Sequence, residues 1–137
     1  MTIQELKPGD CAVISKTISE SDVYLFAGIT GDFNPAHVDE ITAKAGRFGG
    51  RIAHGMLGAG LISAVLGTRL PGPGTIYLGQ ELSFTKPVRI GDTVTALCTV
   101  SKLIPEKNIA YIDTICTNQR GETVIKGTAT VMPPACP

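Results

Sequence analysis

The chain lacks tryptophan and is poor in aromatic residues, which make up 5% of its 137 residues. Single-stranded nucleic acids bind on aromatic stacking platforms, so this class of partner is not expected. Twelve basic and twelve acidic residues leave a formal net charge of zero. The chain therefore has no overall positive field that would attract nucleic acid or an anionic membrane.

The sequence shows no segment typical of secretion or of membrane insertion. The first ten residues, MTIQELKPGD, lack a basic stretch followed by an apolar one. The longest apolar stretch, residues 52–67, contains His54 and is too short and too rich in glycine to span a bilayer. We therefore expect a cytoplasmic protein without a membrane partner.

Hydrophobic residues make up 43% of the chain and charged residues 18%, a balance that predicts a folded protein. The length predicts a single domain over residues 1–137. The cysteines form no Cys-x-x-Cys pair, and a core of this size needs no disulfide bond. We expect all four to be reduced and mostly buried: Cys11, Cys98, Cys116 and Cys136.

The first third of the chain predicts one strand followed by short helices. Weak alternation predicts a strand over residues 11–18. Ser19 followed by Asp22 is typical of the start of a helix, which we expect to run to about residue 29. Residues 31–39 predict a loop, and residues 39–45 predict a short helix.

Residues 55–66, GMLGAGLISAVL, predict a helix whose only polar side chain is Ser63 and which is therefore buried on every side. Its three glycines each cost roughly 1 kcal/mol, which close packing must offset. Four segments rich in Thr, Val and Ile predict strands: 75–86, 92–104, 108–119 and 122–132. Short turns between the later strands favour antiparallel pairing. The expected fold is α+β, with an antiparallel sheet wrapped around a central helix.

The polar residues 31–39 place an acid and an imidazole in one loop. Asp32 and His37 are five residues apart, a spacing that brings two side chains together on neither a helix nor a strand. A loop made rigid by Pro35 and Asn34 can bring both to one water molecule, where they would exchange protons as an acid/base pair. The alternative is a loop of Asx turns in which His37 only packs.

A second candidate site lies at the start of the apolar helix. A helix begins with unpaired N–H groups, and Gly55 lets a ligand oxygen approach its own N–H closely. The alternative is that Gly55 only lets the helix enter the core, while His54 caps the helix, packs or acts as a ligand. For Ser63, the alternatives are a hydrogen bond back to the Ala59 carbonyl or support of the site.

A metal site is a further possibility, because His37, Asp39 and His54 supply the donor set of non-haem iron sites. That site would need His37 and Asp39 on one strand, whereas the sequence around Pro35 predicts an irregular loop. We therefore expect no metal. The sequence also contains no Walker A or G-x-G-x-x-G fingerprint, so the glycines do not indicate a nucleotide loop.

Residues 26–39, FAGITGDFNPAHVD, resemble the hydratase 2 motif of MaoC-like (R)-specific enoyl-CoA hydratases. Further segments fit the same family in the same order: 51–57, 70–80, 84–88 and 91–92. The whole chain is similar to one such domain, and most to the short bacterial enzymes that supply polyhydroxyalkanoate synthesis. The resemblance implies a hot-dog fold, a curved antiparallel sheet around one long helix. Ala36 departs from the family, which usually has a larger aliphatic residue there.

The resemblance implies reversible hydration of trans-2-enoyl-CoA to (R)-3-hydroxyacyl-CoA. Asp32 and His37 would bind a water molecule, add its hydroxyl to C3 and deliver a proton to C2. The Gly55 N–H would stabilise the charge on the thioester oxygen, Asn34 would shape the loop, and Ser63 would support the site. The substrate is itself the CoA thioester, and no cofactor is expected.

For the acyl pocket we expect Leu66, on the apolar helix, and Val131, on the last strand. The sequence does not select which basic residues meet the phosphates of CoA; the candidates are Lys44, Arg47, Arg51, Lys86 and Arg89. The resemblance also implies a homodimer in which two sheets join edge to edge, which would cover an unpaired strand edge.

Hot-dog proteins also include acyl-CoA thioesterases and acyl-carrier-protein dehydratases, many of which carry an acid on the central helix. Residues 55–66 contain no acid, which favours the hydratase. A dehydratase or thioesterase of a related acyl thioester remains the alternative. A binding module without turnover is disfavoured, because Asp32, His37 and Gly55 are all present.

Overall fold

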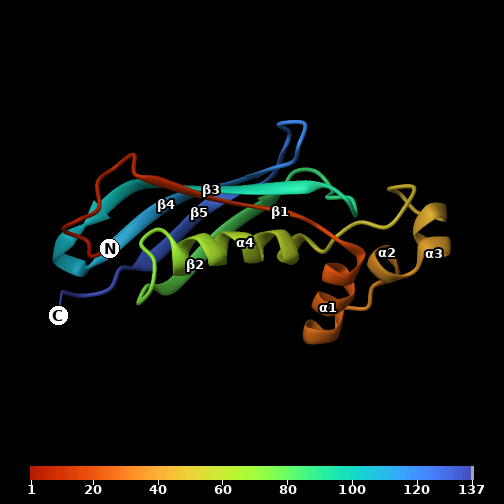
Figure 1. The fold of residues 1–137 in the computed structure, drawn as a ribbon, viewed down its shortest axis with the longest axis horizontal. Coiled ribbons are helices and arrows are strands. Elements are labelled where there is room, and N and C mark those ends of the chain that lie inside the picture. Colours follow the sequence, from red (N-terminus) through yellow and green to blue (C-terminus); the bar gives the residue numbers. More distant parts are fainter. Residues whose placement is uncertain (137) are drawn as a thin grey trace.

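The computed structural model describes residues 1–136, which form a five-stranded antiparallel sheet, one long helix and three short helices (Figure 1). The sheet has the order β1-β3-β4-β5-β2. Its strands are β1 Cys11–Thr17, β2 Ile76–Phe84, β3 Thr93–Ile104, β4 Ile109–Thr117 and β5 Thr123–Met132. The helices are α1 Glu20–Thr30, α2 Pro35–Val38, α3 Glu40–Ala45 and α4 Gly55–Thr68, and Pro105–Lys107 forms a 3-10 turn.

The long helix α4 lies against one face of the curved sheet, as Figure 1 shows. Ile62, Val65 and Leu66 of α4 are almost fully buried and pack in one core with alternate residues of the strands. Each such side chain contributes about 1.5–3 kcal/mol by leaving water. The α+β architecture and the four predicted strands after the helix are thereby confirmed.

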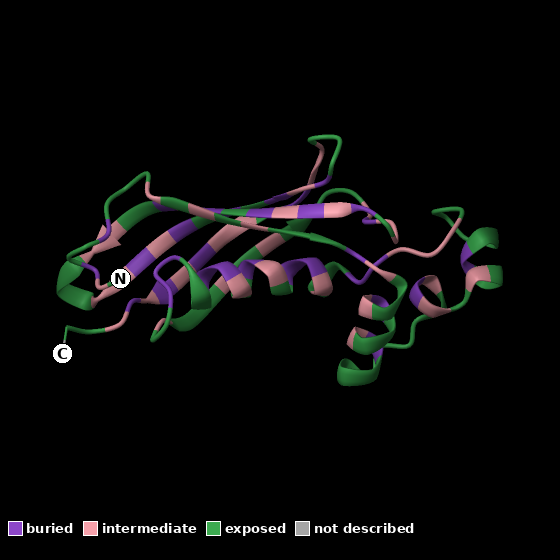
Figure 2. Cartoon of the chain, viewed as in Figure 1, coloured by how far each residue is buried: buried purple, intermediate pink, exposed green. Residues whose placement is uncertain are grey.

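The expectation that α4 is buried on every side is wrong for the described chain. Gly60, Ser63 and Gly67 are exposed, and α4 alternates between buried and less buried stretches (Figure 2). The reason is that one sheet layer covers only one side of a helix. On the covered side a Cβ at Gly58 would lie 2.9 Å from Cδ1 of Ile125, so the glycine lets the helix pack closely on β5 without a shift of that side chain.

The first helices begin where the sequence predicts them, with one difference. Ser19 and Asp22 form the predicted capping box of α1. Residues 31–39 are not a loop throughout, because Pro35–Val38 forms the single turn of α2. Proline suits the first helical position, since the N–H that it lacks has no partner there. Asn34 caps this turn by accepting a hydrogen bond from the Ala36 N–H at 3.1 Å.

All four cysteines are free, but only two of them are buried. Burial raises the pKa of the Cys98 thiol to about 12 and that of Cys116 to about 11. Cys11 and Cys136 are exposed, so the expectation of mostly buried cysteines is wrong for these two. In residues 1–136 no helix has the length and apolarity needed to cross a membrane.

Candidate active site

Asp32, His37, His54 and Gly55 line one hollow of about 350 Å³ at the start of α4. The helices α1, α2 and α3 lie together beyond this end of α4 (Figure 1). Asp32 follows the end of α1, His37 lies on α2, and His54 precedes α4. One oxygen of Asp32 and one ring nitrogen of each histidine lie within 4.8 Å of one another. The structure thus brings Asp32 and His37 together, as the loop hypothesis required.

The buried imidazole of His37 has a defined tautomer. Its Nδ1 lies 2.7 Å from the backbone oxygen of Ile52. A carbonyl oxygen only accepts hydrogen bonds, so Nδ1 carries a proton, and in the neutral imidazole Nε2 carries the lone pair. A neutral imidazole with a free Nε2 is equipped to accept a proton from a neighbouring molecule.

The carboxylate of Asp32 is half exposed, although the backbone around it is well held. Its N–H donates to Oγ1 of Thr30 at 3.2 Å, and its Oδ1 accepts from the Asn34 N–H at 3.2 Å. The second oxygen, Oδ2, lies 4.0 Å from Nε2 of His54. The Asx turn and the convergence of Asp32 on the histidines therefore occur together, and the two interpretations of this loop do not exclude each other.

His54 is buried but does not cap α4 through its side chain. Its Nε2 lies 2.9 Å from the backbone oxygen of Asp32, and its ring stacks on His37 with centroids 3.9 Å apart. Among the sequence-based alternatives for His54, packing is confirmed and side-chain capping is wrong. The contacts join residues that lie far apart in the sequence.

Gly55 is the first residue of α4 and borders two hollows. A Cβ at this position would lie 2.7 Å from Cδ1 and Cε1 of Phe84, so any larger residue would force the Phe84 ring to shift. The first N–H groups of a helix have no partner within the helix. A small ligand oxygen can therefore approach the Gly55 N–H where a side chain would not fit.

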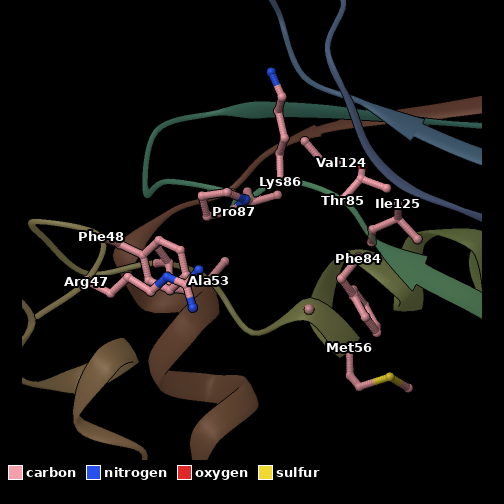
Figure 3. A pocket seen from close by; sticks show the side chains of 13 residues that line it. Arg47, Phe48, Ala53, Met56, Phe84, Thr85, Lys86, Pro87, Val124 and Ile125 are labelled. Atoms are coloured by element: carbon pink, nitrogen blue, oxygen red, sulfur yellow. The ribbon is translucent and has the colours of Figure 1, made fainter.

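The second hollow is larger, about 540 Å³, and mostly apolar. Phe84 and Met56 lie on one side of it, beside the start of α4, and Arg47 and Phe48 lie on the other (Figure 3). The side chain of Lys86 points away from these residues (Figure 3). Phe84 begins the segment 84–88 that fits the family, but the sequence analysis gave it no place in the site, since a strand pattern does not show which side chains reach the start of α4.

Three further predictions concern residues around the site: Ser63 as its support, and Leu66 and Val131 in the acyl pocket. Ser63 is exposed on α4, eight residues after Gly55, which is about 12 Å along a helix. Leu66 and Val131 are buried in the core, at 1% and 0% exposure. None of the three lines either hollow.

The metal hypothesis does not fit the donors as they are arranged. Asp39 caps α3 by accepting from the N–H groups of Ile41 and Thr42, so it is not available as the third ligand. Asp32 takes its place in the cluster with His37 and His54. However, Nε2 of His54 already donates a hydrogen bond to the Asp32 carbonyl, and the other ring nitrogen, Nδ1, is buried. A metal bound at Nε2 would have to break the hydrogen bond to Asp32.

Arg51 was among the candidates for binding the CoA phosphates. In the structure its guanidinium bonds acidic and hydroxyl groups of α1 and α3. Its Nε lies 2.6 Å from Glu40, and its Nη1 lies 2.9 Å from Glu20 and 2.6 Å from the Tyr24 hydroxyl. The hydrogen bonds that the Arg51 guanidinium donates to Glu40 and then to Glu20 raise its pKa. Arg51 therefore ties α1 and α3 to the segment that carries His54.

For the hydration that the sequence resemblance implies, replacing Arg51 with methionine is expected to lower kcat about tenfold and to lower Tm, because the expected catalytic groups lie on separate elements and would lose their common anchor. The measurement is steady-state hydration of crotonyl-CoA together with thermal unfolding. Arg69→Met, at the exposed far end of α4, is the control. A raised KM with unchanged kcat would instead make Arg51 a contact of the CoA moiety.

Residues 9–122 match the family described as MaoC like domain. The chain is 61% identical over 132 residues to an (R)-specific enoyl-CoA hydratase of Rhodospirillum rubrum, covering 96% of this chain and 91% of that one. It is 50% identical over 131 residues to a 3-hydroxybutyryl-CoA dehydratase of Methylorubrum extorquens, with 96% and 83% coverage.

The crystal structure of an (R)-hydratase from Aeromonas caviae involved in PHA biosynthesis superposes with a TM-score of 0.93 at 44% identity, covering 96% of this chain and 99% of that one. The likeness confirms the predicted hot-dog fold. A family match over most of the chain and this likeness lead to one conclusion: the chain belongs to the MaoC-like domain family.

Proposed function

We propose that this chain catalyses the reversible hydration of trans-2-enoyl-CoA to (R)-3-hydroxyacyl-CoA. The observation that carries the proposal is the convergence of the Asp32 carboxylate and the His37 imidazole on one hollow beside the Gly55 N–H. Relatives named (R)-specific enoyl-CoA hydratase and 3-hydroxybutyryl-CoA dehydratase support the substrate class. The two names describe the same bond changes in opposite directions.

In the proposed reaction, Asp32 and His37 hold the water that adds to the double bond. A carboxylate oxygen of Asp32 and a ring nitrogen of His37 lie within 4.8 Å of each other. One water molecule at about 2.8 Å from each atom spans that distance. Nε2 of His37 takes a proton from the water as its oxygen bonds to C3. The electron pair of the double bond moves to C2 and the thioester oxygen, and the proton returns from His37 to C2. The steps are redox neutral and draw only on groups of this chain and the substrate.

The Gly55 N–H is proposed to donate a hydrogen bond to the thioester oxygen. Negative charge develops on this oxygen when hydroxyl adds at C3, and a fixed backbone donor stabilises that charge without rearrangement. One such donor is typically worth about 3 kcal/mol of the barrier. The absence of a side chain at Gly55 beside Phe84 supports this role, because it keeps the N–H accessible to a planar thioester.

We propose that the larger hollow takes the sulfur side of the thioester. C2 and the sulfur are bonded to opposite sides of the carbonyl carbon, so when C2 faces Asp32 and His37 the sulfur faces the other hollow. The apolar lining suits the pantetheine arm, and Arg47 supplies a cation for the phosphates. Lys86 is less suited, because it lies 2.5 Å from Glu122 and is the main cause that lowers the pKa of that carboxyl to about 2.

Arg47→Glu is expected to raise KM for crotonyl-CoA about tenfold, since it replaces an attraction to phosphate by a repulsion. The KM for crotonyl-N-acetylcysteamine, which has no phosphates, is expected to change by less than about twofold. Arg69→Glu provides the control for a change of net charge. An equal rise of KM for both thioesters would contradict the assignment of Arg47 to the phosphates.

A homodimer is proposed from the exposed edge of the sheet. β2 is an edge strand in the order β1-β3-β4-β5-β2, and Ile76, Tyr77 and Leu78 on it are exposed. An exposed apolar edge strand is a template for pairing with another chain, and pairing with a second copy would cover it. The family match over residues 9–122 further supports the single domain that we propose for residues 1–137.

The test of the activity is to incubate the purified protein with crotonyl-CoA and longer 2-enoyl-CoAs. We expect loss of the absorbance of the conjugated double bond and formation of the (R)-3-hydroxy product. Thiol release should be followed in the same reaction with a thiol reagent. Release of CoA without hydration would make the protein a thioesterase, and an (S) product would contradict the proposed stereochemistry.

A further inference from the structure

We infer that His54 is a positioning residue for the proposed hydration, holding the backbone of Asp32 and the ring plane of His37. The inference rests on the proposed function, which assigns no role to His54. Its Nε2 lies 2.9 Å from the Asp32 backbone oxygen, and its ring stacks on His37 with an interplanar angle of 29°. Phe26 packs on it with ring centroids 4.7 Å apart. The imidazole thus contacts both members of the acid/base pair.

The tautomer of His54 follows from these contacts. The Asp32 carbonyl only accepts, so Nε2 must donate, and in the neutral imidazole the lone pair is then on Nδ1. Nδ1 is buried and is the one buried side-chain nitrogen or oxygen without a hydrogen-bond partner among residues 1–136. An unpartnered buried polar atom lowers stability. A phenyl ring would fill the same space without that loss, so packing alone does not explain an imidazole here.

The hydrogen bond from His54 restrains Asp32 where the loop is otherwise open. Asp32 follows Gly31, which adopts a left-handed φ of 80°, and its carboxylate is half exposed. Its N–H is bound by Thr30 and its carbonyl by His54, so the peptide groups on both sides of the Asp32 Cα are held. Orientation of the carboxylate toward His37 depends on that backbone. Small displacements of a catalytic group strongly reduce the rate.

Two variants separate the donor from the ring. His54→Phe keeps an aromatic ring against His37 but has no donor for the Asp32 carbonyl. His54→Gln places an amide N–H at about the reach of Nε2 but removes the stacking ring. For His54→Phe we expect kcat for crotonyl-CoA to fall about tenfold while KM changes less than about twofold and Tm stays level or rises. For His54→Gln we expect a lower Tm but recovery of kcat to within about threefold of the parent.

The expected order of the two variants in kcat is thus the reverse of their order in Tm. A purely structural role would lower kcat and Tm together. Full kcat in His54→Phe would overturn the inference, because the donor would then be dispensable. A fall of kcat that follows the fall of Tm in both variants would also overturn it, since His54 would then act only through folding.

A readout independent of activity is available because the chain contains two histidines, both in this cluster. Long-range proton–nitrogen spectra of the nitrogen-15-labelled protein should show one imidazole in the Nε2–H form, His54, and one in the Nδ1–H form, His37. Assignment follows from the signal lost in His54→Phe. An Nδ1–H form of His54 would overturn the inference even if the enzyme hydrates. Absence of hydration by the parent protein, with the expected tautomers present, would instead contradict the proposed function.

Discussion

Asp32→Asn and His37→Ala are each expected to lower kcat for crotonyl-CoA hydration by at least about 100-fold, the lower end for a general acid/base group. Asparagine keeps the shape of the aspartate side chain but offers the water an amide in place of a carboxylate. Alanine removes the Nε2 lone pair that accepts the proton. The measurement is kcat under saturating substrate, with Tm recorded for each variant.

The two losses should not add in the double variant, because both side chains act on one water molecule. Asp113→Asn, an exposed residue of β4, is the control for the loss of one carboxylate. The mechanism is contradicted if either single variant keeps more than about a tenth of the parent rate.

The second large loss of kcat is expected when the Gly55 N–H is removed. A substitution with proline removes it, because proline has no backbone N–H. Gly55 is the first residue of α4, a position that tolerates proline, and His54 before it has an extended ψ of 136° that suits a following proline. The ring would collide with Phe84, which already lies 2.7 Å from a Cβ at this position. The comparison should therefore be made in a Phe84→Leu background.

In that background, Gly55→Pro is expected to have a kcat about 100-fold below that of Gly55→Ala, the loss typical of one oxyanion donor. The two variants both add a Cβ, and only alanine keeps the N–H. Any effect of Phe84→Leu on substrate binding is common to both. Equal rates for the two variants would show that the Gly55 N–H does not stabilise the reaction.

The strands and caps were predictable because their signals are local. The capping box of Ser19 and Asp22 needs only two side chains three residues apart, and the β4–β5 hairpin needs only a short turn between alternating segments. The pairing of β2 with β5 was not predictable, since partner choice depends on how the whole sheet curves around α4. The exposed side of α4 was missed for the same reason, because a helix that is apolar all round carries no mark of which face meets the sheet.

The site residues likewise divide into those that the sequence identified and those whose place only the structure showed. Asp32, His37 and Gly55 were identified from motifs in the chain, and the structure places them around one hollow. The support of the site by Ser63 and the acyl pocket at Leu66 stay predictions, since neither residue lines a hollow in the described chain. Motif resemblance names residues but does not measure how far apart they lie.

By itself, the sequence determined the element order and the residues with reactive groups, because hydrophobic periodicity, capping residues and the Asp32-to-His37 motif are written within short stretches. Only the tertiary structure decided that His54 bonds the Asp32 backbone, that Arg51 ties two helices, and that the Phe84 ring lies against Gly55. Each of these contacts joins residues at least eleven positions apart. Their partners are selected by folding of the sheet and helices, which no local pattern records.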